Sequence, residues 1–138
     1  MPQDKYFRKE LVTELKRVER LIKKEPSLEK KLYYFSAAYG ITSRTYRYSF
    51  SREVLMADFV LHTSYGMLQE RLSRMKSGDS TVLIEDEHLN KICKGLKLLA
   101  EKFENEESIQ EPLELILTTA FSTTGPGNYL REKGSITL

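Results

Sequence analysis

The fold is decided by residues 89–103, which read LNKICKGLKLLAEKF. Apolar residues recur here in alternating steps of three and four positions: Leu89, Ile92, Leu96, Leu99 and Phe103. This spacing puts them on one side of an α-helix, in the pattern with which helices pack in bundles. Ile84 and Leu89 also have the spacing of a hydrophobic staple around Glu85. We therefore predict a helix over about 85–104.

Upstream, the N-terminal residues predict another amphipathic helix. From Phe7 to Ile22 apolar residues recur every three or four positions, and Pro26 is a residue that a helix interior does not accommodate. A helix over about 4–25 follows from this pattern.

The next segment predicts a short helix followed by a connector. Ser27 is a suitable N-cap, and Gly40 tolerates the positive φ at which many helices end. We therefore predict a second helix over about 27–39. Residues 41–49 are rich in Thr and Tyr and show no helical period, so we predict extended backbone there.

Two further helices are indicated by capping patterns. Phe50 and Leu55 flank Ser51 with staple spacing, which predicts a long helix over about 51–76. Ser108 and Glu111 have the spacing of a capping box, which predicts a helix over about 109–121.

These helices together predict an all-α protein, an antiparallel (up-and-down) four- or five-helix bundle. The 138 residues suffice for one core, so we expect a single domain over 1–138. Residues 81–84 fit either an extended piece or the first turn of a helix, and both alternatives stay open. The tail, 122–138, is rich in Gly and has no period, so it is expected to be irregular or to become ordered only against a partner.

The composition indicates a reducing, aqueous environment. Cys93 is the only cysteine, so the chain cannot form an internal disulfide. The N-terminus lacks the apolar stretch of a signal peptide, and nowhere do about 18 apolar residues run together, as a membrane span requires. We expect a cytoplasmic protein without a membrane partner.

The charges are divided unevenly along the chain. Residues 1–76 hold 16 Lys and Arg against 9 Asp and Glu, a net charge of +7, whereas residues 77–138 hold 6 against 11, a net charge of −5. Basic and acidic helices that neighbour one another in the bundle explain this split. Head-to-tail self-association is the alternative.

The leading functional hypothesis is a noncatalytic protein that works by self-association, as a homo-oligomer such as a dimer, or by binding another protein. It rests on the charge split, on the tail, and on the helix predicted over 109–121. Apolar residues cover most of the circumference of that helix, so it is expected to be buried between other helices or at a subunit interface.

A second hypothesis is binding of an anionic ligand or nucleic acid. Arginines that can grip phosphate alternate with tyrosines that can stack on bases, at Arg44, Tyr46, Arg47, Tyr48 and Arg52. A loop whose tyrosines pack on the bundle explains the same residues, and a total charge of only +2 makes nucleic acid the less favoured partner.

A third hypothesis is an enzyme with a site between helices. Asp58, His62 and Tyr65 share one face of the helix predicted over 51–76, close enough for a hydrogen-bonded triad. A satisfied polar network that fixes the helix register explains them equally well. Gly66 beside them marks either a close helix crossing or room for a ligand.

We predict no metal and no cofactor. Glu85 and His88 have the Glu-x-x-His spacing of di-iron bundles, but those sites need two such pairs, and acids at a helix start are common anyway. Residues 123–128 lack the Gly-Lys-Ser/Thr of a phosphate-binding loop. Cys93 lies on the apolar stripe, where a thiol is unreactive.

Overall fold

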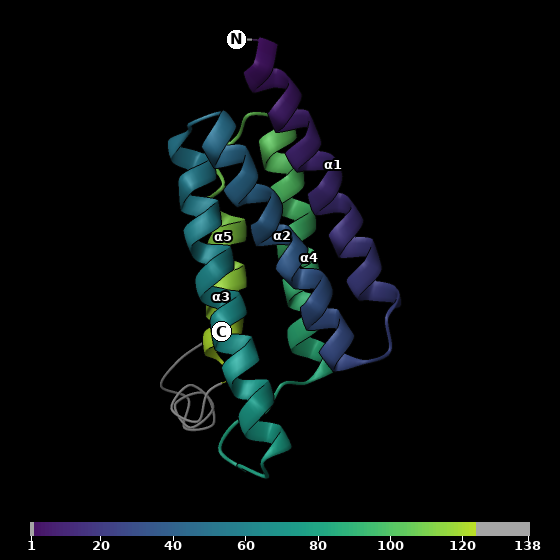
Figure 1. The fold of residues 1–138 in the computed structure, drawn as a ribbon. Helices are drawn as coiled ribbons and strands as arrows, with labels where there is room; N and C mark the ends of the chain where they lie inside the picture. Colours follow the sequence, from purple (N-terminus) through teal and green to yellow (C-terminus); the bar gives the residue numbers. More distant parts are fainter. Residues whose placement is uncertain (1, 124–138) are drawn as a thin grey trace.

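The computed structural model describes residues 2–123, with side-chain surroundings from residue 5 onward. Within that range lie five helices: α1 (Pro2–Lys24), α2 (Leu28–Tyr48), α3 (Arg52–Lys76), α4 (Asp86–Glu104) and α5 (Gln110–Phe121). Figure 1 shows consecutive helices running in alternating directions. All of them except α2 begin and end within two residues of the predicted bounds.

The helices form a closed ring in which each packs against two others. The pairs in contact are α1 with α2, α2 with α3, α3 with α5, α5 with α4, and α4 with α1. Because the ring has five members, antiparallel packing cannot hold all the way round, and α3 and α5 run in the same direction (Figure 1). Residues 2–123 contain no strand, so the prediction of an all-α up-and-down bundle is confirmed.

The core lies along the axis of this ring. All five residues of the stripe that decided the fold are buried: Leu89, Ile92, Leu96, Leu99 and Phe103. They join buried side chains of the other helices, among them Leu11, Leu15, Phe35 and Leu61.

The prediction that the second helix ends at residue 39 is wrong. Helix α2 continues through Gly40 to Tyr48, so residues 41–48 are helical and not an extended connector. The continuation buries Ile41, Thr42 and Thr45 in line with Ala38. This burial outweighs the low helix propensity of Gly and Thr, because tertiary packing supplies most of the stability of a helix.

The chain between α3 and α4 is a turn followed by irregular backbone. Residues 80 and 81 lie in a turn and residues 82–85 in neither helix nor strand, which decides against a helical first turn. Val82 and Ile84 are buried, and the Leu83 N–H donates to the Thr123 carbonyl over 3.2 Å. This link ties the connection to the end of α5.

Helix α5 packs tightly against its own chain. Leu113, Ile116 and Ala120 are buried, and the approach of α4 is so close that a Cβ added at Gly95 would lie 2.5 Å from Ile116 Cγ1. The expectation that this helix is largely buried is therefore met by packing within a single copy of the chain.

The tail predicted to be irregular lies, beyond residue 123, outside the described residues. None of the five helices is both long and apolar enough to cross a membrane.

Candidate interaction surface

Large apolar side chains are exposed at the start of α3. They are Phe50 (76% exposed), Leu55 (41%), Met56 (48%) and Phe59 (70%), and we call these four residues the α3 patch. Leu55, Met56, Phe59 and Val60 line a shallow hollow of about 360 Å³ that no polar residue borders. Contiguous apolar surface of this kind is typical of interaction sites.

The α3 patch is exposed because the opposite side of the helix fills the core. Val54, Ala57 and Leu61 are buried, and at 3.6 residues per turn Leu55, Met56 and Phe59 fall on the far side. Sequence reasoning missed the α3 patch because Leu55 was assigned to a staple and Phe59 to no role. The available signal was that these residues lie off the stripe through Val54 and Leu61.

The basic aromatic residues Arg44, Tyr46, Arg47, Tyr48 and Arg52 lie at the end of α2 and the start of α3. The Arg44 guanidinium pairs with Glu10 of α1 over 2.7 Å. The Tyr48 ring stacks on Phe7 with centroids 5.3 Å apart, and Tyr46 packs beside Phe50 at 5.4 Å.

Arg47 and Arg52 are exposed and form no ion pair with any residue of 5–123. The helix therefore leaves two of the three arginines of this segment available to a partner.

Asp58 and His62 do meet, on the side of α3 that faces α2. The hydroxyls of Thr42 and Ser43 donate to Asp58 Oδ1 over 2.8 and 2.7 Å. His62 Nδ1 lies 3.4 Å from the same oxygen and 3.2 Å from the Asp58 carbonyl. This carboxylate therefore links α2 to α3.

Tyr65 does not complete a hydrogen-bonded triad with Asp58 and His62. Its hydroxyl accepts a hydrogen bond from Gln69 Nε2 over 2.9 Å. Its ring packs on Tyr39, whose centroid is 4.1 Å from that of His62. The nearby hydroxyls donate to Asp58 and not to His62, so the arrangement resembles a register-fixing network more than a nucleophile with its base.

The Glu-x-x-His spacing of Glu85 and His88 serves as a capping box for α4. The Glu85 side chain accepts from the His88 backbone, and the Glu85 N–H donates to His88 Nδ1 over 2.9 Å. Among the side chains of residues 5–123 no group of three or more potential metal ligands is found. Cys93 is buried, and this burial, together with the charge of Glu19, raises the pKa of its thiol to about 11. Little thiolate is present near neutral pH.

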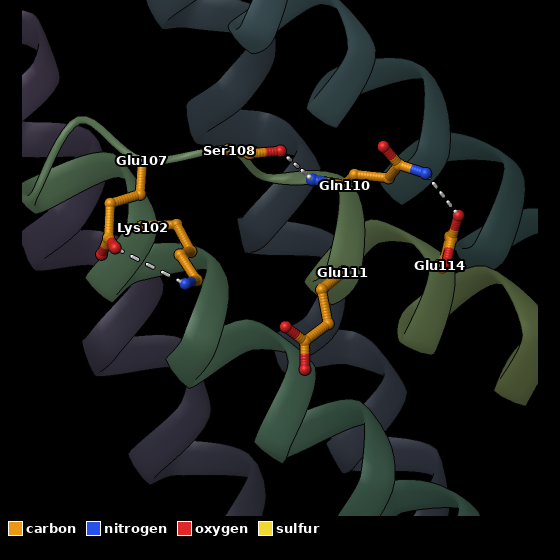
Figure 2. A pocket seen from close by; sticks show the side chains of 6 residues that line it. All are labelled: Lys102, Glu107, Ser108, Gln110, Glu111 and Glu114. Carbon is orange, nitrogen blue, oxygen red and sulfur yellow. Dashed lines mark hydrogen bonds and ion pairs between the residues drawn. The ribbon is translucent and has the colours of Figure 1, made fainter.

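An acidic hollow lies where α4 gives way to α5. Figure 2 shows its lining, which consists of Lys102, Glu107, Ser108, Gln110, Glu111 and Glu114. Lys102 pairs with Glu107 over 3.8 Å, and Gln110 donates to Glu114 over 2.9 Å. Three glutamates against one lysine give the connection between α4 and α5 a net negative charge.

No family model, no curated protein and no solved structure matches this chain.

Proposed function

We propose that this protein is noncatalytic and works through protein–protein contact, first of all self-association through the α3 patch. The observation that carries the proposal is the exposure of Phe50 just before α3 and of Leu55, Met56 and Phe59 near the start of that helix. From the usual size of such side chains they offer on the order of 450 Å² of apolar surface. That is about half of the roughly 800 Å² that each partner buries in a standard interface.

The α3 patch is a better candidate than α5 for this contact. Leu113, Ile116 and Ala120 are already covered by their own chain, so the apolar character of α5 is largely accounted for. Among the large apolar side chains of α5, only Phe121 is clearly exposed.

Replacement of Phe59 by Asp tests the proposal. A charge at the centre of an apolar contact must be desolvated without a partner, so we expect at least a ten-fold weaker self-association, which corresponds to about 1.4 kcal/mol or more. Sedimentation equilibrium over a range of protein concentrations measures it.

The matched control is Tyr33→Asp, because Tyr33 is 71% exposed on α2 and outside the α3 patch. We expect this variant to associate like the unmodified protein. Equal association of the unmodified protein and both variants would exclude the α3 patch as the contact.

A second candidate function is binding of an anionic ligand or nucleic acid. The exposed Arg47 and Arg52, which form no ion pair within residues 5–123, favour it. A labelled single-stranded oligonucleotide should then bind with an affinity that falls with rising salt. Binding should be lost in an Arg47→Ala, Arg52→Ala double variant but kept in the control Arg17→Ala, Arg20→Ala. Equal loss in both variants would indicate nonspecific attraction and no site.

A cytoplasmic location remains part of this proposal. Cys93, the only cysteine, is free and buried, which fits a reducing compartment.

A further inference from the structure

A groove lies between the first turns of α1 and the end of α4. Its volume is about 380 Å³, which is within the usual range for sites that bind small ligands. Arg8 and Val12 line it from α1, and Phe103 lines it from α4. No residue of the α3 patch or of the basic aromatic segment 44–52 borders it, so the groove is a separate surface.

The inner wall of this groove is apolar. Val12 and Phe103, which are 6% and 1% exposed, close it toward the core. The methylene stems of the lysines at its rim add apolar surface, because long basic side chains keep mainly their charged heads in water. A molecule in the groove therefore meets hydrocarbon on its inner side and cations at the rim.

The charge of the groove is predominantly positive. Lys16 is neutralised by Glu104 over 2.9 Å. One further carboxylate, that of Glu106, borders the groove. Against it stand three cations that form no ion pair with any residue of 5–123: Lys5, Arg8 and Lys9. An excess of positive charge in a hollow attracts anions.

The end of the bundle explains why these three cations lack ion-pair partners. Lys16 pairs with Glu104, the last residue of α4, and Lys9 lies about two turns earlier, roughly 10 Å further along α1. Figure 1 shows that α1 begins beyond the end of α4. The first turns of α1 therefore extend past the helix that supplies the partner of Lys16.

Arg8 is the residue best placed to hold an anion. It is half-buried, yet its guanidinium makes no hydrogen bond and no ion pair with residues 5–123. By contrast, Arg44 and Arg74 each pair with a carboxylate of the bundle over 2.7 Å. A guanidinium offers a planar fork of N–H donors that matches the oxygens of a carboxylate or a phosphate. These donors of Arg8 remain available to an anion in the groove.

Glu53 of α3, which borders a neighbouring hollow together with Arg8, is held by other donors. The Ser51 hydroxyl donates to Glu53 over 3.0 Å. The pKa of Glu53 is lowered first by its backbone N–H, then by this hydroxyl, and also by the charge of Arg8. The two side chains thus feel each other without a direct ion pair, and the guanidinium keeps its donors.

We propose that the groove binds a small anionic ligand with an apolar body, namely a phosphate or carboxylate that carries an alkyl or aryl group. Arg8 holds the anionic group, and Lys5 and Lys9 attract it at the rim. The apolar body lies against Val12 and Phe103. This site is independent of the proposed self-association.

Octyl phosphate is the probe for this site, because it joins a phosphate to an alkyl chain. Inorganic phosphate and octanol represent its two halves. In isothermal titration calorimetry we expect octyl phosphate to bind about ten-fold or more tightly than either half. If octanol bound equally well, the cations would take no part, and if inorganic phosphate did, the apolar wall would take none. Either result would overturn the proposal.

Arg8→Ala and its matched control Arg20→Ala test the anion contact. Arg20 is exposed on the same helix, lies outside the groove and forms no ion pair with residues 5–123. Both variants lose one positive charge, but only Arg8→Ala should weaken the binding of octyl phosphate, by about ten-fold or more. Unchanged binding in Arg8→Ala, or equal weakening in both variants, would overturn the site.

Amide chemical shifts locate the ligand and show that each variant is folded. Addition of octyl phosphate should move the amide resonances of Val12 and Thr13 in the groove. The resonances of Leu55 and Phe59 in the α3 patch should stay in place. Shifts confined to the α3 patch or to segment 44–52 would put the ligand elsewhere and overturn the proposal.

Discussion

Gly95 and Ile116 show how a single atom sets the distance between two helices. A Cβ at Gly95 would lie 2.5 Å from Ile116 Cγ1 and 3.5 Å from the Pro112 carbonyl oxygen. Only the absence of a side chain allows α4 and α5 to approach this closely. The same residue type at Gly40 and Gly66 meets open space.

Gly95→Ala should destabilise the protein. Overpacking in a core costs about 1–3 kcal/mol, and the better helix propensity of alanine offsets about 1 kcal/mol of that. A net loss of up to about 2 kcal/mol in the free energy of unfolding is expected from urea denaturation.

The double variant Gly95→Ala, Ile116→Ala is the check on this explanation. Its destabilisation should be smaller than the sum of the two single effects, because the truncated Ile116 leaves room for the new methyl group. Simple additivity would show that the contact between these two residues is not the cause.

At the residue scale, the sequence does not predict which glycine lies against a neighbouring helix and which faces open space. Gly40, Gly66 and Gly95 all interrupt helical segments, and we expected the first to end a helix and the second to mark a crossing or a ligand. The neighbours of a Cβ depend on which helices come together, and a local pattern does not contain that information. The meeting of Asp58 and His62 was predictable because it depends only on spacing within one helix.

Helix ends are the element-scale features that local sequence determines best. The side chains of Ser27 and Ser51 accept hydrogen bonds from the backbone N–H of Lys30 and Val54, as their N-cap assignment requires. The predicted end of the second helix at residue 39 was wrong because a glycine that can end a helix is a weaker determinant than tertiary packing. Burial of Ile41 and Thr45 decided the length of α2, and burial is a tertiary property.

The end of α3 gives a prediction at the element scale. Gly78 has a φ of 86°, and the Asp79 and Gly78 N–H groups donate to the carbonyls of Arg74 and Met75, as in a Schellman motif. Gly78→Ala should lower the free energy of unfolding by about 1–2 kcal/mol, since a Cβ is strained at this φ.

Gly78→Asn is the companion variant, because asparagine tolerates this conformation better than alanine does. Thermal unfolding should rank the proteins with the unmodified chain first, Asn second and Ala last. If alanine proved as stable as glycine, the left-handed cap would not be a source of stability.

At the scale of the whole molecule, closure of the five-helix ring decides which helix faces remain exposed to solvent. The order α1, α2, α3, α5, α4 covers α5 on both sides and turns the face of Leu55 and Phe59 outward. The periodicity of the chain predicted the helices and the all-α class, but not this order. The α3 patch therefore became visible only in the assembled bundle, whereas the charge split was visible from the start.

The measurement that tests self-association most directly is sedimentation equilibrium of the unmodified protein at low and at high salt. An apolar contact through Phe50, Leu55, Met56 and Phe59 predicts a dimer that persists at high salt, because salt screens charges and does not weaken apolar burial. A monomer at both salt concentrations would contradict the proposed function.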